Sequence, residues 1–323
     1  IAFFIKRGGT TKTEAVVRHA QLYGPREVKY DWLNTHDLET TDWQQLRPSS
    51  PFYLFIPRDE KYLSRYLSFA SIAAVFVKFN SGIIAGRDRL AVHFTADELW
   101  RTLVAFSKMQ PELARQAFAL GKDARDWSVV RAQEDLRDAG LDRDRLVRLT
   151  YRPFDTRWTY NTGKNKGFLR WLYPEFMRHM LAGDNLALVA PKQHKDEFGA
   201  LATDTIGAHK SVAAYDINYY FPLYLYPTID QQDLFVYHET SERKPNLNPS
   251  FVAALTAAYG TAPTPEDFFN YIYAVLYAPA YRTKYAEFLR MDFPRIPFTA
   301  DAKLFRMLAT LGEKLVALHL LKS

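Results

Sequence analysis

Short apolar and aromatic runs, each bounded by glycine, proline or charged residues, dominate residues 1–94 and 149–226. Runs of about four to eight such residues are typical of β-strands. The run at 51–57 has proline at both ends, so we expect an edge strand there. The pattern as a whole predicts strands at residues 1–5, 15–23, 51–57, 68–77, 75–79, 90–94, 149–160, 186–190 and 219–226.

Helix start and stop signals dominate the rest of the chain. Thr95 precedes two acids, and Thr264 precedes a proline and two acids, which are good N-terminal caps with a favourable first turn. Gly140 is a typical helix stop. The signals predict a helix that opens at Thr95 and further helices at 111–120, 127–139, 251–259, 268–277, 279–289 and 301–320.

Together these patterns predict an α+β fold with a mixed β-sheet core. We expect four parts along the 323 residues. They are a strand-rich segment at 1–80, a mostly helical connector at 81–150, a β-rich core at 151–240 and a helical C-terminal subdomain at 241–323.

Composition narrows the class of protein. Hydrophobic residues make up 48% and charged residues 24%, so the chain can form a sizeable core. Cysteine is absent, which excludes disulfide scaffolds, thiol nucleophiles and cysteine zinc sites and favours a cytoplasmic location. No stretch is long and apolar enough for a membrane helix. The chain opens with IAFFIKRGG and lacks an initiator methionine, so we expect a piece of a longer polypeptide.

The sequence nominates no catalytic centre and no metal site. The nucleotide-binding patterns G-x-x-x-x-G-K-[ST] and G-x-G-x-x-G and the hydrolase patterns H-E-x-x-H and G-x-S-x-G are missing. His194 and His209 lie fifteen residues apart in an irregular region, so a shared metal is an unfavoured hypothesis. An enzyme that uses scattered carboxylates and histidines is likewise the weaker alternative.

A basic, aromatic segment at 151–178 is the strongest functional signal. It carries six bases and two acids, 6 − 2 = +4, against a net charge of +6 for the whole chain. Such cations neutralise phosphates, while interleaved rings contact sugars and bases. The candidates are Arg152, Arg157, Lys164, Lys166 and Arg170, and we expect Lys164 and Lys166 to lie on a flexible loop. The alternatives are a hairpin with aromatic inner and basic outer faces, and a structural role for Arg157.

Two further polar clusters follow predicted strands. Lys192, Gln193, His194 and Lys195 come directly after the strand at 186–190, where lysine and glutamine could read base edges. A solvated turn is the alternative. In the second cluster Gly82 and Gly86 flank a loop that ends in Arg87 and Arg89, which could bind phosphate. A structural pair between Arg87 and an aspartate is the alternative there.

Several segments resemble, in their order, the C-terminal specificity region of Type ISP restriction-modification enzymes, over nearly the whole chain. They are SGIIAGRD (81–88), YRPFDTRW (151–158), PEFMRHML (174–181), DNLAL (184–188) with Lys192 and Gln193, FPLYLYP (221–227), PNLNP (245–249), YIYAVL (271–276) with PAYR (279–282), and DFPRIP (292–297).

The resemblance implies the target recognition domain of a longer enzyme that also carries a nuclease, a helicase-like ATPase and an N6-adenine methyltransferase. The methyltransferase motifs [DNS]-P-P-[YF] and F-x-G-x-G are absent from the sequence. The implied fragment therefore holds no cofactor and is not catalytic, whereas the parent enzyme uses S-adenosylmethionine, ATP and magnesium.

The implied partners are double-stranded DNA and an upstream methyltransferase domain, against which residues 1–80 are expected to pack. Methyltransferases of this kind flip their target base, so the recognition domain would grip the duplex from the opposite side. The alternative function is a scaffold that contacts neighbouring domains without binding DNA itself.

Overall fold

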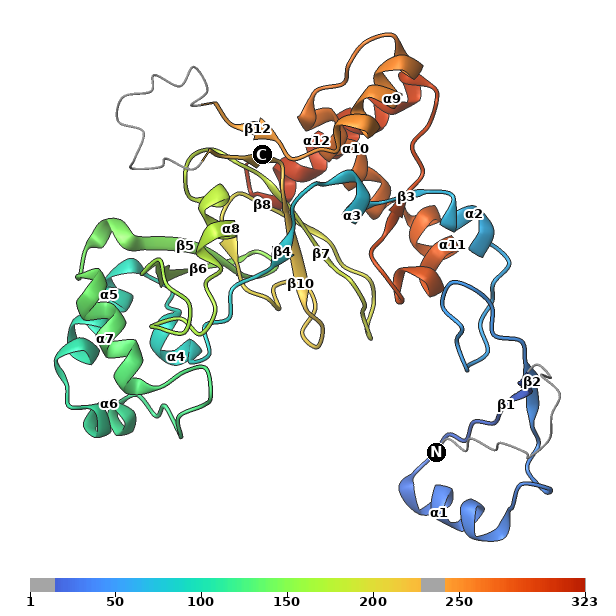
Figure 1. Ribbon diagram of the computed structural model, residues 1–323, viewed down its shortest axis with the longest axis horizontal. Coiled ribbons are helices and arrows are strands. Elements are labelled where there is room, and N and C mark those ends of the chain that lie inside the picture. The colour runs from blue at the N-terminus through green and yellow to red at the C-terminus, as the bar shows by residue number, and fades with distance from the viewer. Residues whose placement is uncertain (1–14, 228–241, 323) are drawn as a thin grey trace, which may run out of the picture. The chain divides into compact units, whose positions relative to one another are not determined.

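The computed structural model describes residues 15–227 and 242–322 (Figure 1). It divides into two compact units, residues 1–61 and 62–323. None of the described helices is long and apolar enough to cross a membrane.

The first unit consists of two short antiparallel strands and one helix. β1 (Val17–His19) pairs with β2 (Gln44–Leu46), and α1 (Arg26–Thr35) lies between them in the sequence. The strand expected at 15–23 is confirmed over its central residues, while the one expected at 1–5 lies outside the described residues. No residue from 15 to 61 is buried, so the described part of this unit has no hydrophobic core.

The run at 51–57 forms turns, and the expected edge strand is wrong. Tyr53 takes a left-handed φ of 45°, and its amide donates to the carbonyl of Ser49 at 2.8 Å. The prolines at both ends of the run have no amide to donate to a neighbouring strand.

The second unit is built on a four-stranded sheet in which all neighbours are antiparallel. Figure 1 shows β4, β10 and β7 side by side at its centre. The strands, in order across the sheet, are β4 (Asn80–Ser81), β10 (Asn218–Pro222), β7 (Ala187–Pro191) and β8 (Leu201–Thr203). Every residue of β7 is buried. The strand expected at 186–190 is confirmed, and the one at 219–226 continues past β10 into β11 (Tyr224–Leu225), which pairs with β12 (Lys244–Pro245).

A three-stranded sheet packs beside the helical layer. β5 (Leu146–Arg152) and β6 (Asp155–Tyr160) form the hairpin expected at 149–160. Its turn places Phe154 at a left-handed φ of 60°. β9 (Ile206–Gly207) runs parallel to β5 on the other side.

The helical layer forms as its caps predict. The hydroxyl of Thr95 and the carboxylate of Glu98 complete a capping box at the start of α5, and Gly140 ends α7 with φ 72°. The helices are α4 (Asp88–Ala91), α5 (Ala96–Lys108), α6 (Pro111–Ala117) and α7 (Val129–Ala139), followed by a 3₁₀ turn η1 (Arg143–Arg145). Leu103, Phe106 and Trp127 are fully buried in the core that this layer shares with the hairpin.

The apolar runs between 62 and 94 form short helical turns joined by irregular segments, which corrects the continuous strands expected at 68–77, 75–79 and 90–94. Strand pairing within these three runs is limited to β3 with β13, and to single bridges from Phe76 to Leu247 and from His93 to Trp158. A run without a neighbouring strand leaves its backbone groups unpaired, and a helical turn satisfies them locally. The elements are α2 (Leu63–Leu67), β3 (Ala70–Ser71), α3 (Ile72–Val75) and β13 (Arg295–Ile296).

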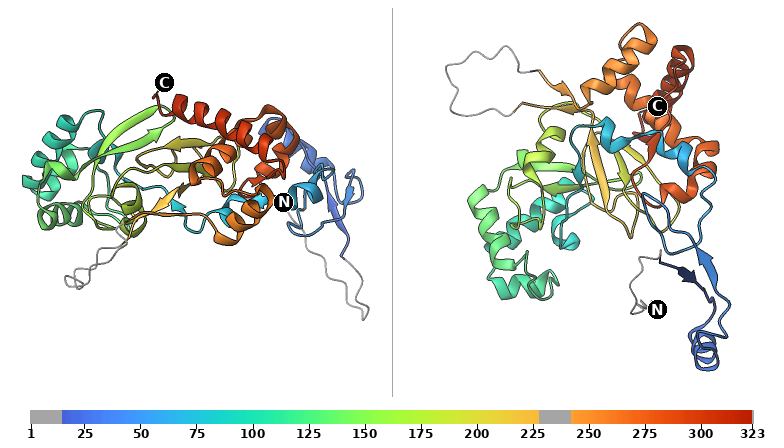
Figure 2. Two further views of the ribbon diagram at one scale, coloured as in Figure 1. Left: turned by 90° about the horizontal axis from the view of Figure 1, so that it is seen from above. Right: turned by 45° about the vertical axis from the view of Figure 1, so that its right-hand side comes forward.

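The C-terminal helices cover the edge of the central sheet at β8. The hydroxyl of Tyr273 accepts from the amide of Ala202 at 3.1 Å, and Tyr277 donates to the carbonyl of Ala200. α10 and α12 lie side by side in Figures 1 and 2, and a Cβ on Gly312 would lie 1.8 Å from the carbonyl oxygen of Asn270. The helices are α9 (Pro249–Tyr259), α10 (Pro265–Tyr277), α11 (Pro279–Leu289) and α12 (Ala302–His319), as expected.

His179 is a buried base on the one-turn segment that follows the hairpin. It lies in η2 (Arg178–Met180), directly after α8 (Pro174–Met177), and is 1% exposed. Its Nδ1 accepts from the amide of Tyr226 at 3.0 Å. Burial, and then the charges of Arg178 and Lys78, lower the pKa of His179 to about 4.

The lowered pKa makes stability depend on pH with a definite sign. An unfolded histidine takes up its proton near pH 6.5, whereas folded His179 stays neutral down to about pH 4. The unfolded state therefore binds more protons between these values, and we expect His179 to cost the chain about 2 to 3 kcal/mol of stability as the pH falls from 6.5 to 4. Urea unfolding across this range should show less pH dependence for His179→Asn, which keeps an acceptor. An equal dependence in both proteins contradicts this assignment.

Candidate nucleic-acid interface

The β5–β6 hairpin carries a stack of aromatic rings and guanidinium groups. The guanidinium of Arg157 lies 4.2 Å from the ring centre of Phe94 and 4.1 Å from that of Tyr151, and Arg152 lies 4.4 Å from Tyr151. Asp155 binds Arg157 from the same strand, at 3.0 Å to Nε and 2.7 Å to Nη2, and raises the pKa of Arg157. Two rings and a carboxylate thus enclose Arg157. These contacts fit the structural role that was the alternative to DNA binding for this residue.

Arg152 and Arg89 differ in how many of their side-chain donors already have hydrogen-bond partners. Arg152 donates from Nη1 to the carbonyls of Tyr151 and Lys210, at 2.8 and 3.0 Å. Arg89 lies exposed on α4, next to Asp88, whose carboxylate accepts from the hydroxyl of Tyr151 at 2.7 Å. No hydrogen bond or ion pair involves the Arg89 side chain within the described parts of the chain.

The segment at 161–168, here called the basic loop, is held in place rather than flexible. Asp135 of α7 accepts from the hydroxyl of Thr162 and from the amide of Phe168, both at 2.7 Å. Asn165 accepts from the amides of Leu172 and Tyr173 at 2.9 and 2.8 Å. These contacts correct the expectation of a flexible loop: the segment has fixed points at its start, middle and end.

Both lysines of the basic loop are exposed between these fixed points. The Lys164 side chain is 59% exposed, and its ammonium lies 3.8 Å from the carboxylate of Asp138. Lys166 takes a left-handed φ of 59°, and its ammonium lies 5.1 Å from the ring centre of Trp171. Exposed ion pairs of this length contribute little, so both charges remain available to a polyanion.

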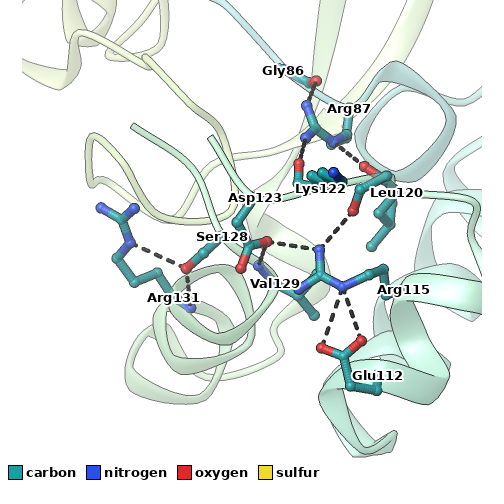
Figure 3. Close-up of polar contacts among 11 residues, drawn as sticks. Gly86, Arg87, Glu112, Arg115, Leu120, Lys122, Asp123, Ser128, Val129 and Arg131 are labelled. Atoms are coloured by element: carbon teal, nitrogen blue, oxygen red, sulfur yellow. Dashed lines mark hydrogen bonds and ion pairs between the residues drawn. The ribbon is translucent and has the colours of Figure 1, made fainter. Parts of the chain in front are cut away.

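The side chains of Arg170 and Arg87 are engaged in hydrogen bonds within the protein. Arg170 donates to Asp126 at 3.2 Å and packs against Gly86, where a Cβ would lie 3.0 Å from that of Arg170. Arg87 donates from all three nitrogens to carbonyl oxygens, of Leu120, Gly86 and Lys122 (Figure 3). Carbonyl contacts thus take the place of the aspartate pair that was one alternative for Arg87.

Figure 3 shows the polar network that fixes the segment between α6 and α7. Arg115 binds Asp123 at 2.8 Å and Glu112 at 3.2 Å. The hydrogen bond from Arg115 lowers the pKa of Asp123. Asp123 in turn accepts from the amide of Val129. The network seats Trp127, whose indole donates to the carbonyl of Phe168 at 3.1 Å. The helical layer therefore supports the basic loop a second time.

The turn at 192–195 contacts a different part of the second unit. The ammonium of Lys192 lies 4.0 Å from the carboxylate of Asp292, and Gln193 donates to the carbonyl of Met291 at 3.2 Å. Both side chains and that of Lys195 are exposed. His194 is 7% exposed, with Nδ1 2.7 Å from the carbonyl oxygen of Asp196, so its ring belongs to the interior of the turn.

The segment at 81–86 joins several of these groups. Ile84 and Trp171 exchange two backbone hydrogen bonds, of 2.8 and 3.0 Å. On its other side the amide of Ile83 donates to Gly207 at 2.8 Å, and a Cβ on Gly82 would lie 2.5 Å from the carbonyl carbon of Ala208. This segment therefore lies between Trp171, which follows the basic loop, and β9 of the hairpin sheet.

A pocket of about 380 Å³ adjoins the basic loop. Arg178 lines the pocket and donates to the carbonyls of Tyr226 and Pro227 at 2.9 and 3.0 Å. The lining residues are Asn161, Gly163, Leu172, Pro174, Glu175, Met177, Arg178, Leu181 and Ala182. Among the described residues, no group of three or more histidines and acids is placed to hold a metal ion.

Asp135 and Asn165 are the site residues that the sequence analysis missed. One signal was present: Asp135 falls on the face of α7 that also carries Val129, Ala132 and Leu136, all fully buried. An acid on the apolar face of a helix needs a partner, and here the partners are the hydroxyl and amide of the basic loop. Asn165 gave no comparable signal.

The family described as the Type ISP C-terminal specificity domain matches residues 74–323. No curated protein matches the chain. Among solved structures, the chain is similar to one titled "cryoEM structure DrdV-DNA complex", with 24% identity and a TM-score of 0.67 over 91% of this chain and 29% of that one.

Two further structures are similar. One is a nuclease-deletion mutant of the Type ISP restriction-modification enzyme LlaGI in complex with a DNA substrate mimic, with 19% identity and a TM-score of 0.60 over 91% of this chain and 27% of that one. The other is the ATP-dependent Type ISP restriction-modification enzyme LlaBIII bound to DNA, with 18% identity and a TM-score of 0.63 over 86% and 18%. The chain thus spans less than a third of each of these proteins and shares their fold.

Proposed function

We propose, because this chain belongs to the Type ISP C-terminal specificity domain family, that it binds duplex DNA and recognises a short sequence for a longer restriction-modification enzyme. The observation that carries the proposal is the basic loop, which presents Lys164 and Lys166 to solvent from a backbone fixed by Asp135 and Asn165. The three similar structures are all DNA complexes by title, which supports the same function.

We divide the candidate residues by what their contacts leave free. Lys164, Lys166 and Arg89 are exposed and act as phosphate contacts. Arg152, with unused donors beside the hairpin, joins them. Arg87, Arg157 and Arg170 are held by carbonyls or carboxylates, and they contribute chiefly by shaping the surface.

We assign base reading to the turn at 192–195. The exposed amide of Gln193 can pair with adenine and the ammonium of Lys192 with guanine. Lys195 is exposed and suits a phosphate, while His194 shapes the turn from within.

The remaining chemistry belongs, in this proposal, to other parts of the longer polypeptide. Methylation with S-adenosylmethionine, and cleavage driven by ATP and magnesium, are placed outside the present chain. The specificity domain would position DNA for an upstream N6-adenine methyltransferase.

Phosphate contacts and base contacts should respond differently to substitution. Lys164→Ala and Lys166→Ala should each weaken binding on all sequences and lower the slope of log affinity against log salt by about 0.9, because each removes one phosphate contact. Gln193→Ala should leave the slope unchanged and alter the preferred sequence. Fluorescence anisotropy with labelled duplexes between about 50 and 200 mM salt measures both effects.

A surface lysine away from the candidate residues serves as the control. Lys303 is exposed at the start of α12, and Lys303→Ala should leave the slope unchanged. Equal slopes for Lys164→Ala, Lys166→Ala and Lys303→Ala would remove the basic loop from the DNA contacts.

A second function, contact with neighbouring domains, is favoured by exposed apolar surface. α12 buries Phe305 and Val316, yet its other face exposes a row of apolar side chains. These are Leu304, Met307, Leu311 and Leu318, exposed by 43, 56, 58 and 53%. The first unit, whose described residues include none that is buried, needs a partner surface still more. We assign the upstream methyltransferase domain as the partner of both the first unit and the exposed face of α12.

Hydrogen exchange tests this second function. A ten-residue helix with no buried side chain is marginal alone, so the amides of α1 should exchange quickly in the isolated chain. They should slow by at least about tenfold when the methyltransferase domain is present. The amides of α10, which is buried in both cases, are the internal control. Unchanged exchange in α1 would show that the first unit docks elsewhere.

A further inference from the structure

Asp135 is an acid without a basic partner in the interior of the helical layer. It is 2% exposed, and no lysine or arginine in the described parts of the chain forms an ion pair with it. A buried carboxylate is costly unless hydrogen bonds replace its water. The donors are the hydroxyl of Thr162 and the amide of Phe168, each at 2.7 Å and both from the basic loop.

The close contact between the basic loop and Asp135 requires a glycine at position 167. A Cβ on Gly167 would lie 2.0 Å from Oδ2 of Asp135, so only glycine lets the loop backbone approach the carboxylate this closely. Lys164 and Lys166 therefore lie between residues that are held by hydrogen bonds, namely Thr162, Asn165 and Phe168. Hydrogen bonds thus hold the loop backbone on both sides of each lysine in the chain without a ligand.

We infer that Asp135 is a positioning residue for DNA binding, an inference that rests on the function proposed for the basic loop. A loop that is already ordered loses less conformational entropy when it binds, which raises affinity without adding a contact. The effect runs against the direct charge effect, because a carboxylate beneath the loop repels a polyanion. Asp135 thus favours the binding of an anion by geometry while opposing it by charge.

The same helix supplies a matched control. Asp138 lies three residues further along α7, its side chain is 71% exposed, and its carboxylate lies 3.8 Å from the ammonium of Lys164. Asp135→Ala and Asp138→Ala each remove one negative charge from one helix near one lysine, and Asp135→Ala also removes the acceptor of both bonds to the basic loop. A pure charge effect would strengthen binding in both variants, whereas a positioning effect separates them.

The experiment is anisotropy on the 323-residue chain, with a labelled duplex of mixed sequence as the probe. Asp138→Ala should bind up to about threefold more tightly than the unaltered chain. Asp135→Ala should bind about tenfold more weakly and keep the unaltered salt slope, because the phosphate contacts in the complex are the same. Thr162→Val, which removes one bond to Asp135 without changing charge, should weaken binding in the same direction.

The outcomes separate the inference from the function on which it rests. If Lys164→Ala and Lys166→Ala leave binding unchanged, the basic loop is not a DNA contact and the proposed function of the loop fails. If those lysines matter but Asp135→Ala and Thr162→Val bind as tightly as Asp138→Ala, the loop binds DNA and only the positioning role is overturned. Thermal melting of each variant sets the temperature at which all are folded, and Thr162→Val keeps the test valid should Asp135→Ala not fold.

Discussion

The buried carboxylate of Asp135 is the constraint around which this surface is organised. It ties α7 to both ends of the basic loop, and Gly167 makes the approach possible. Trp127 adds a second tie from the same helical layer, and Arg87 and Arg115 fix the segment that holds it. A surface of exposed lysines thus rests on buried polar bonds, which tolerate the loss of a partner poorly.

The basic residues of this surface fall into two groups, arginines enclosed by protein contacts and lysines exposed to solvent. Arg157 is enclosed by two rings and a carboxylate, and Arg87 by three carbonyls. Lys164 and Lys166 reach solvent with only weak partners. Arginine suits the first role because its planar group stacks and binds in several directions, and lysine suits the second as a hydrated point charge. Basic residues in one segment therefore need not share one function.

Local signals predicted the helices well, and distant pairing limited the strands. The caps at Thr95 and Thr264 act within four residues, so the sequence around them was sufficient. The strand expected at 68–77 depends on a partner near Arg295, which pairs with only two of its residues, and the residues after them form a helical turn. The same distinction applies to the site: the basic composition of the loop is local, whereas its order comes from Asp135 on a separate helix.

The most direct test of the central claim is selection from a pool of randomised duplex DNA at low salt, with sequencing of the bound fraction. We predict an enriched motif of several base pairs, because the turn at 192–195 would read bases while the basic loop holds phosphates. Binding that leaves the pool unenriched, or no binding at all, would contradict the claim that this chain carries sequence recognition by itself.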